Sequence, residues 1–568
     1  MKGVVKQDFN LVTNPWIKVV DSQSNKTKLV SMADLFKNAQ NYRDLAGEMH
    51  TQDLAILRAP LLAILTTVFS RFDAAGEAYD WLNVDEETWT ASLADDEVDI
   101  DDVQEVLLET WENIYQDGKF PDKVVEYLDK YKDGFNLFGE NAFYQVSSDV
   151  YDRMVPAKNK LSTGTGKVAV RQINRLISES GNSPAIFSPK SSLGKDEITL
   201  PEFVRWLITY QNFAEVGGNV PKIKDAGAGD SGWLYNIDPV IVKGENLFET
   251  LMFNLVLRPE DKKKILQHPY WEADKITYFS NRANNTPPNN IAELYTNVAK
   301  MMHIDWKDGK PTIYVAKLTK PDTTNAFIEP MTTWDYDSTK ANYYPKVKKK
   351  DYLSKRMWRD FGFYIKSSND GDHEPGIVRW IDKLKEEDIL PEDMLVNLEA
   401  INFVKADTKN QAPYFEVYDN MSINAGVLFD RNQATFWPKR IEDTVEKTQA
   451  VGEAFEDFAS DLGKLRGLKD DPLEGFKKKL SAEFYDQLNK PFNDWLASLR
   501  AGQEPDKEIT KWKNTLKNEV SRAGNRVLQS ASPRDIVGRK ESKGVTNIFT
   551  LYNQMQDNVS ERLNNVRK

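Results

Sequence analysis

Apolar residues in the last quarter of the chain recur at the spacing of buried helical faces. Val451, Phe455, Phe458, Leu462 and Leu465 are separated by four, three, four and three residues, which places them along one side of an α-helix. Three more such helices are expected after it, and four amphipathic helices with short connections typically pack as a bundle. The second begins at Asp471 and Pro472 and carries Phe476, Leu480, Phe484, Leu488, Phe492 and Trp495; the third carries Ile509, Trp512, Leu516 and Val520; the fourth begins at Ser532 and Pro533 and carries Ile548, Leu551, Met555, Val559 and Leu563.

The amino-terminal pattern is different, because it alternates between strand and helix signals. Residues 9–20 and 28–31 predict a β-hairpin with a turn between them. Ser31 then caps a short helix. Thr51 begins a second helix, whose leucines occupy almost every side, as in a buried helix.

The middle of the chain mixes short strands with helices. Residues 239–242 and 312–315 predict strands, and residues 247–257 predict a helix. Long connections rich in Gly, Pro and Asn separate them at 216–233 and 281–290. Loops of this length inside a compact domain are usually functional or disordered.

Length and pattern together predict two domains. A chain of 568 residues exceeds the size at which one hydrophobic core stops growing. We expect residues 1–426 to form a large, irregular α+β domain and residues 427–568 to form the all-α four-helix bundle.

Composition narrows the class of protein. The residues are 40% hydrophobic and 29% charged, which is typical of a packed globular protein. The absence of cysteine excludes disulfides and thiolate zinc sites and agrees with a reducing cytoplasm. No signal peptide or membrane-spanning stretch is evident, so a cytoplasmic protein without a membrane partner is expected.

The formal net charge of -12 argues at first against nucleic-acid binding, which needs cationic surface. Its distribution changes this interpretation, because residues 85–112 hold twelve acidic residues and no Lys or Arg. The remainder of the chain is therefore balanced in charge. This acidic segment repels misplaced DNA or is simply a solvated insertion; the sequence does not decide between them.

Two regions are locally basic. Residues 346–359 include aromatic residues among the cations, and residues 500–568 contain 14 Lys and Arg against 8 Asp and Glu. Cations beside flat aromatic rings suit phosphates and bases, although a solvated loop or helix face is the more common explanation of one charge run. The cations chosen as candidates in the first tract are Lys346, Lys348, Lys349, Lys350, Lys355 and Arg356.

Signatures of catalysis are scarce. The sequence STGTGK at 162–167 resembles a phosphate-binding loop, but Leu161 replaces its first glycine and Val168 replaces the Ser or Thr that would hold magnesium. No motif of a serine hydrolase, zinc protease or dinucleotide site occurs. The acidic cluster around Asp372 and His373 is the one candidate for a hard cation, and a solvated turn explains it better. We therefore expect no catalytic residue, metal or cofactor.

Several segments in order resemble CasA, the large subunit of the type I-E Cascade complex of CRISPR systems. They are FNLVTNPWIKV at 9–19, TQDLAILRAPLLAIL at 51–65, FNLFGENAFYQV at 135–146 and KGENLFETLMFNLV at 243–256, and the helical bundle follows them. Each segment alone is weak, but their order over nearly the whole chain is specific.

The resemblance implies a binding role inside a ribonucleoprotein. In that family the guide RNA reads the target, and the large subunit reads the protospacer-adjacent motif (PAM) in the minor groove of double-stranded DNA and begins strand separation. The implied partners are guide RNA, the backbone, small and handle-binding Cascade subunits, target DNA carrying a PAM, and the separate helicase-nuclease. The rival hypotheses are a metal-dependent nuclease and an assembly scaffold that never contacts DNA.

The resemblance also implies a wedge that enters the base stack beside the motif. Asn410, Gln411 and Ala412 match its tripeptide and lie between two strand-like segments. An amide side chain can exchange hydrogen bonds with exposed base edges, and unstacking one step costs a few kcal/mol. An ordinary surface hairpin is the alternative.

The resemblance also implies a glycine loop and a lysine finger. Gly217, Gly218 and Asn219 follow a helix over 200–213 and fit the loop laid against the minor groove, with Gly227 and Gly229 as the rival position. The lysine finger is best matched by Lys320, with Lys317 as the alternative.

A further loop of the family contacts the guide RNA through an aromatic ring. Phe187 occupies the corresponding place in SPAIFSPKSS, and a phenyl ring can stack on an unpaired base.

Overall fold

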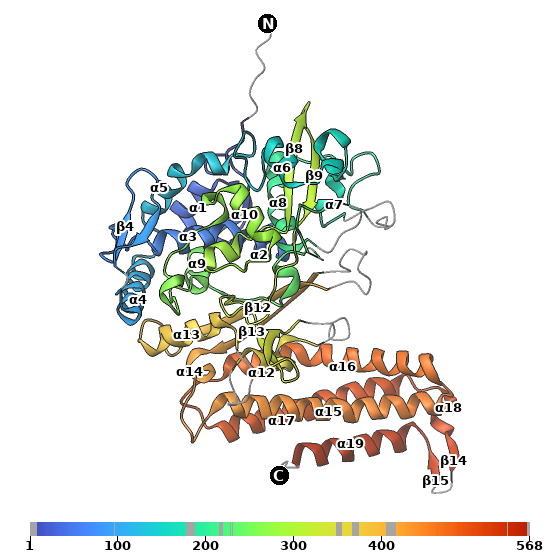
Figure 1. Ribbon diagram of the computed structural model, residues 1–568. Coiled ribbons are helices and arrows are strands. Elements are labelled where there is room, and N and C mark those ends of the chain that lie inside the picture. Colours follow the sequence, from blue (N-terminus) through green and yellow to red (C-terminus); the bar gives the residue numbers. More distant parts are fainter. Residues whose placement is uncertain are drawn as a thin grey trace. The chain divides into compact units, whose positions relative to one another are not determined.

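The chain divides into two compact units in a computed structural model (Figure 1). The first unit comprises Met1–Lys350, Pro375–Trp380 and Glu399–Tyr418, and the second comprises Asp351–Glu374, Ile381–Leu398 and Asp419–Lys568. The boundary near residue 427 stays a prediction. The structure describes residues 8–95, 97–177, 188–214, 220–227, 229, 231–347, 355–365, 374–404, 416–541 and 544–564.

The mixed α+β character expected of the amino-terminal part is confirmed, and so is a bundle of long helices toward the carboxyl terminus. The strands are β1 (Ile17–Asp21), β2 (Thr27–Val30), β3 (Tyr42–Leu45), β4 (Leu82–Val84), β5 (Ala91–Leu93), β6 (Lys167–Val168), β7 (Val240–Lys243), β8 (Lys300–Lys307), β9 (Lys310–Lys317), β10 (Trp334–Asp337), β11 (Asn342–Pro345), β12 (Leu395–Phe403), β13 (Glu416–Asn424), β14 (Arg539–Glu541) and β15 (Gly544–Thr546). The helices are α1 (Met32–Asn38), α2 (His50–Ile56), α3 (Ala63–Phe69), α4 (Ile100–Asp117), α5 (Lys123–Lys130), α6 (Ser148–Met154), α7 (Val170–Ile173), α8 (Leu200–Phe213), α9 (Leu247–Asn254), α10 (Lys275–Ala283), α11 (Ile291–Tyr295), α12 (Phe361–Tyr364), α13 (Gly376–Glu386), α14 (Ala425–Leu428), α15 (Trp437–Leu465), α16 (Asp470–Ser498), α17 (Pro505–Gln529), α18 (Pro533–Val537) and α19 (Ile548–Asn564).

The amino-terminal hairpin forms as the sequence predicts. β1 pairs antiparallel with β2, and β3 joins on the other edge to give the order β2-β1-β3. The Ser31 hydroxyl accepts a hydrogen bond from the backbone N–H of Asp34 at 3.1 Å and so caps α1. The predicted cap is therefore confirmed.

A buried helical run crosses the first unit. α2 continues through a π-helical turn η2 (Leu57–Leu62) into α3, and Pro60 lies inside that turn. The run is long and apolar enough to cross a membrane by length and composition, yet 94% of its most apolar window is buried inside the protein. The buried Arg58 donates to Glu329 at 2.6 Å, and this charge is thus compensated within the core.

One three-stranded sheet and one helix position the candidate site. The sheet has the order β6-β9-β8, with β8 and β9 joined as an antiparallel hairpin. α8 begins at the cap Thr199 and spans the residues predicted for it. Almost every side of α8 is buried, so its carboxyl end is held firmly where the long loop after residue 213 departs.

The second unit is dominated by long helices. α15 packs against α16 and α19, and α17 packs against α16, as Figure 1 also shows. The predicted stripe of α15 is buried throughout, and so are Trp512, Leu516 and Val520 of α17. The predicted bundle is therefore confirmed.

Two predicted helix starts are wrong. α16 begins at Asp470 rather than Asp471, and no side chain caps it. Ser532 does cap a helix, but that helix is α18 and ends at Val537. The hairpin of β14 and β15 follows, and the predicted fourth helix begins only at Ile548 as α19.

Candidate nucleic-acid interface

Several of the residues expected to contact nucleic acid lie outside the described residues, and their roles stay predictions. Those that the structure describes are Lys317, Lys320, Lys346, Lys355 and Arg356, together with the rival glycines Gly227 and Gly229. Those outside the described ranges are Asn410, Gln411, Ala412, Gly217, Gly218, Asn219, Phe187, Lys348, Lys349 and Lys350.

The carboxyl end of β9 brings two lysines together. The backbone N–H of Lys317 donates to the carbonyl of Pro221 at 2.7 Å. The backbones of Lys222 and Lys317 form an isolated parallel β-bridge. Burial and the positive charge of Lys222 lower the pKa of Lys317. Two cations that repel each other are thus held side by side by backbone pairing.

The hydroxyl of Thr319 joins the next turn of chain to this strand end. Thr319 Oγ1 accepts from the N–H of Gly227 at 2.9 Å and donates to the carbonyl of Ala283 at 2.7 Å. The Nζ of Lys222 donates to the carbonyl of Gly227 at 2.7 Å. The hydroxyl therefore fixes the glycine segment against α10 and against β9.

Gly229 and Lys320 come close in the same region. Gly229 has φ of +88°, and a Cβ there would lie 3.0 Å from the Cβ of Lys320. Only glycine adopts this conformation without strain. The structure thus places the rival glycine position beside the preferred lysine, and we call Lys222, Lys317 and Lys320 the lysine cluster.

The sequence reasoning missed Lys222 and Thr319. A signal was present, since Lys222 and Lys224 directly precede the glycines in PKIKDAGAGD. Glycines beside cations are typical of loops that approach phosphates. The partner of Thr319 could not be found this way, because Gly227 is 92 residues distant in the chain.

Residues that flank the undescribed segments also converge. Phe213 ends α8 two residues before 215–219, and Phe403 ends β12 two residues before 405–415; their rings meet edge to face at 5.2 Å. Arg175, three residues before 178–187, donates to the carbonyl of Phe213 at 3.1 Å. The described ends of all three segments therefore lie together.

Glu416 is the first described residue after 405–415, and hydrogen bonds to its carboxylate hold it in place. Glu416 accepts hydrogen bonds from the backbone N–H groups of His50 and Thr51 at 3.1 and 2.6 Å, and from the Thr51 hydroxyl at 2.6 Å. An anion at a helix N-terminus is favoured by the exposed N–H groups and the helix dipole. The ring of His50 stacks on Tyr418 at 4.1 Å, so β13 starts from a rigid base.

The basic tract around residue 350 is partly structural. Arg356 lies 3.7 Å from the carboxylate of Asp419. Trp358, one of the aromatic residues in this tract, is buried and stacks on Phe492 at 4.2 Å, so its ring is not available to bases. Burying a large aromatic ring in the core is more favourable than leaving it exposed beside cations. Lys346 and Lys355 are half-buried.

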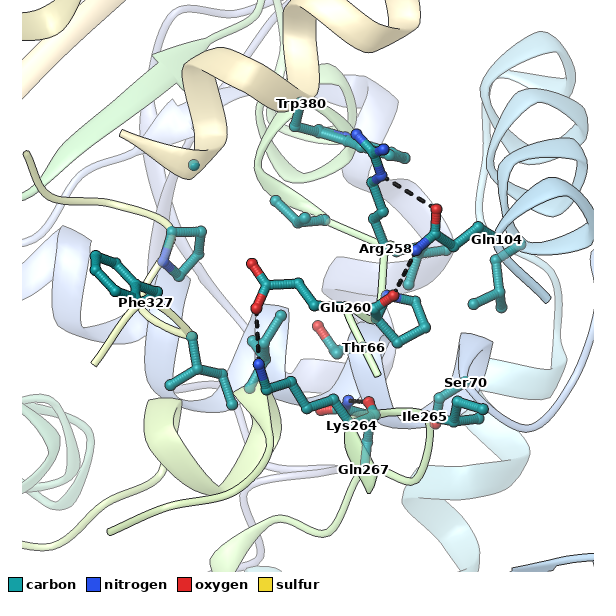
Figure 2. A pocket seen from close by; sticks show the side chains of 18 of the residues that line it. Thr66, Ser70, Gln104, Arg258, Glu260, Lys264, Ile265, Gln267, Phe327 and Trp380 are labelled. Carbon is teal, nitrogen blue, oxygen red and sulfur yellow. Dashed lines mark hydrogen bonds and ion pairs between the residues drawn. The ribbon is translucent and has the colours of Figure 1, made fainter. Parts of the chain in front are cut away.

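A pocket of about 380 Å³ lies elsewhere in the first unit (Figure 2). Its apolar wall includes Trp380 and Phe327, and its one carboxylate, that of Glu260, is held by Lys264 at 2.7 Å. No predicted site residue lines it, and its described lining has hydroxyls without a histidine.

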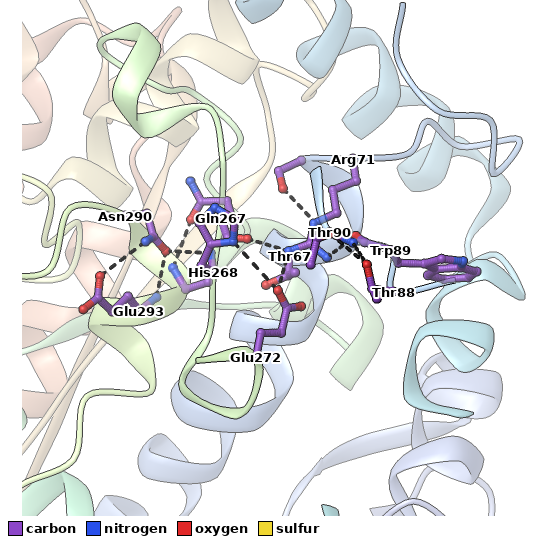
Figure 3. Close-up of polar contacts among 12 residues, drawn as sticks. Thr67, Arg71, Thr88, Trp89, Thr90, Gln267, His268, Glu272, Asn290 and Glu293 are labelled. Atoms are coloured by element: carbon purple, nitrogen blue, oxygen red, sulfur yellow. Dashed lines mark hydrogen bonds and ion pairs between the residues drawn. The ribbon is translucent and has the colours of Figure 1, made fainter. Parts of the chain in front are cut away.

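A polar network stands beside that pocket (Figure 3). Arg71 donates to the carboxylate of Glu272 at 2.7 Å and to the carbonyl of Trp89 at 2.8 Å. Burial acts to raise the pKa of Glu272, but the nearby His268, the charge of Arg71 and hydrogen bonds from Arg71 and Tyr127 outweigh it and lower the pKa. Since Trp89 belongs to the acidic segment, this network fixes that segment to the core.

The described part of the chain offers no cluster of metal ligands. It contains no group of three or more His, Asp or Glu side chains that could hold an ion. Asp372 and His373, on which the nuclease alternative depends, lie outside the described ranges.

Comparison with known proteins identifies related chains. The family model described as CRISPR-associated protein Cse1 matches residues 10–523. Cse1 of Thermobifida fusca is 20% identical, with a TM-score of 0.74 and 98% of each chain covered. CasA (Cse1) of Thermus thermophilus is 18% identical, with a TM-score of 0.66 and coverage of 98% of this chain and 99% of that one. A chain of a CRISPR RNA-guided surveillance complex is 13% identical, with a TM-score of 0.64 and coverage of 97% and 99%. A search of curated proteins finds no match.

Proposed function

The chain belongs to the Cse1 family, also called CasA, the large subunit of the type I-E Cascade surveillance complex, and from this premise we propose that it reads the PAM. In this proposal the protein contacts the motif in the minor groove of double-stranded DNA and opens the duplex so that the guide RNA can pair. It binds rather than catalyses, and it recruits a separate helicase-nuclease that degrades the target. We expect it to act in the cytoplasm.

Candidate segments that are distant in the sequence lie close together in two places, and this supports the proposal. Lys320 lies beside Gly229, and Phe213 and Phe403 bring the ends of two further candidate segments together. A glycine segment lets backbone groups approach base edges, and a lysine supplies charge to the phosphates. A scaffold that never contacts DNA has no need of this arrangement.

The assignments within the proposal differ in support. Lys320 is the lysine finger, because it is exposed, whereas Lys317 is half-buried and paired through its backbone. Gly227 and Gly229 have contacts with the lysine cluster that favour them as part of the reading loop. Asn410, Gln411 and Ala412 supply the wedge, and Phe187 contacts the guide RNA, as the family resemblance implies.

The test uses the assembled complex with guide RNA. Gln411→Ala and Asn410→Ala variants are measured for binding to matched targets that differ only in the adjacent motif. We expect weaker binding and a smaller preference for the correct motif. Unchanged affinity and preference in both variants would remove the wedge assignment.

The rivals predict other outcomes. A metal-dependent nuclease requires that the purified chain cleave DNA with magnesium and lose this activity on Asp372→Ala. A pure scaffold requires that no substitution in the lysine cluster alter DNA binding.

A further inference from the structure

Exposed apolar side chains gather at one end of the helices of the second unit. Ile536, Val537, Val545 and Phe549 are 47%, 74%, 51% and 48% exposed. They belong to α18, β15 and the start of α19, which Figure 1 shows together. Single exposed apolar residues are common, but a contiguous group typically marks an interaction site.

The chain turns tightly between these residues, which brings them onto one surface. A Cβ at Gly538 would lie 2.2 Å from the carbonyl oxygen of Thr546, and the φ of Gly538 is +71°. The backbone after Val537 is therefore against the strand that carries Val545. We call Arg534, Ile536, Val537, Arg539, Lys540, Val545 and Phe549 the bundle tip.

The cations of the bundle tip form no ion pair with the carboxylates that the structure describes. Arg534, Arg539 and Lys540 are exposed, and none forms an ion pair with a described residue. A Cβ at Gly467 would lie 3.5 Å from Arg534 Nη2 and 3.7 Å from Arg539 Nη2, so both guanidinium groups approach the same point. Two like charges this close repel each other, so an anion that joins them is favoured.

The frame beneath the bundle tip is rigid. The buried carboxylate of Asp535 accepts from the guanidinium of Arg466 at 2.9 Å and from the N–H of Ser532 at 2.9 Å. The Ser532 hydroxyl accepts in turn from the N–H of Asp535 at 3.3 Å. These bonds hold α18 in place before any partner binds, which lowers the entropic cost of docking.

We propose that the bundle tip docks an acidic protein segment that presents apolar side chains, supplied by another protein of the assembled complex. Arginines and an apolar centre are typical of protein interfaces. Single-stranded nucleic acid would favour aromatic platforms, whereas three of the four apolar residues here are aliphatic. The inference goes beyond motif reading and does not depend on it.

Hydrogen exchange tests the proposal directly. Amide exchange at α18, β14 and β15 is compared in the free chain, in the complex with guide RNA, and in that complex with target DNA. We expect at least tenfold slower exchange on assembly and no further change with DNA. Slowing that appears only with DNA would make the partner a nucleic acid and overturn the proposal, and so would unchanged exchange throughout.

Substitutions test the chemistry. Val537→Asp and the double variant Arg534→Glu/Arg539→Glu should weaken association with the other subunits about tenfold, measured by mass photometry of reassembly. Lys517→Glu is the matched control, since Lys517 is an exposed lysine of α17 without an ion pair to a described residue. Surface substitutions of this kind leave stability nearly unchanged, and thermal unfolding verifies this. Equal assembly of tip variants and control contradicts the proposal.

Discussion

The lysine cluster of the first unit and the bundle tip of the second are both basic, but their neighbours differ. Around Lys222 and Lys320 lie glycines, a hydroxyl and backbone carbonyls. Around Arg534 and Arg539 lie exposed aliphatic side chains. Backbone and point charges suit phosphates and groove edges, whereas an apolar surface gains by excluding water.

Positive charge alone therefore does not identify the partner of a surface. Lysine is a compact, strongly hydrated cation, and arginine is a planar group that is more weakly hydrated. The first suits a hydrated groove, and the second suits a surface that is dehydrated on docking. The expected partners are therefore DNA for the lysine cluster and protein for the bundle tip.

The largest expected effect separates the two surfaces by charge reversal. Lys222→Glu/Lys320→Glu should weaken target binding about 100-fold at moderate salt and reduce the slope of log affinity against log salt by about two, because two phosphate contacts are lost. Arg534→Glu/Arg539→Glu should leave that slope unchanged. Binding titrations of the assembled complex at several salt concentrations measure both.

Lys310→Glu is the control for this experiment. Lys310 is exposed at the opposite end of β9 from Lys317, roughly 23 Å away at the rise of a β-strand. Equal losses in the control and in the cluster variant would show that net charge matters and position does not.

The next effect concerns how the bundle tip is held. Asp535→Ala should lower the free energy of local opening of α18 by about 1–3 kcal/mol, because Arg466 and the N–H of Ser532 lose their acceptor. Hydrogen exchange of α18 measures it, with the exposed Asp557→Ala as control. An opening energy that stays the same would mean that apolar packing alone holds the bundle tip.

The same carboxylate predicts a dependence on pH. Burial acts to raise the pKa of Asp535, but the hydrogen bonds from Arg466 and Ser532 outweigh it and lower the pKa. Its stabilising effect is therefore present above the unfolded-state pKa near 4 and is lost as the pH falls through the lower folded-state value. Opening of α18 should increase below about pH 4 in the native protein and not in Asp535→Ala.

A smaller effect is expected at Thr319, whose hydroxyl positions the glycine segment. Thr319→Val keeps the shape of the side chain but removes both hydrogen bonds of the hydroxyl. The ordered conformation of the glycine segment should be destabilised by about 1 kcal/mol. Preference for the correct motif should fall about fivefold, while Thr319→Ser should restore it. If both variants behave alike, the hydroxyl has no positioning role.

The smallest expected effect is a difference in pH dependence between the lysine cluster and the arginines of the bundle tip. Because the pKa of Lys317 is lowered by burial and by Lys222, DNA binding should decline a few-fold at a pH where an ordinary lysine is still charged. Lys222→Gln should move this decline to higher pH. Docking at the bundle tip should not change there, since arginine stays protonated. Titrations in alkaline buffers with a constant salt concentration check the difference.

The fold was predictable from the sequence where an element depends on residues that are close together in the chain. The stripe of α15 and the cap at Ser31 are read from neighbouring residues, and both are confirmed. Ser532 is a correct cap signal, but it does not specify a length, and the chain leaves the helix at Gly538 with a positive φ. The predicted fourth helix therefore began too early.

The candidate site was predictable only in part. Lys320, Lys317, Gly227 and Gly229 were named from the family resemblance, but nothing in the sequence joined them. Thr319 was not named at all.

The family and the division into α+β and helical regions could be read from the sequence alone, and the residues named for nucleic-acid contact stay predictions. Periodicity and ordered motifs are properties of the chain, so they need no tertiary contact to be read. Only the tertiary structure decided that Lys222 lies beside Lys317, that Trp358 is buried, and that the apolar residues of the bundle tip share one exposed surface. Each of these follows from packing between segments distant in the chain, where burial and hydrogen bonding compete, and a local pattern does not contain the outcome of that competition.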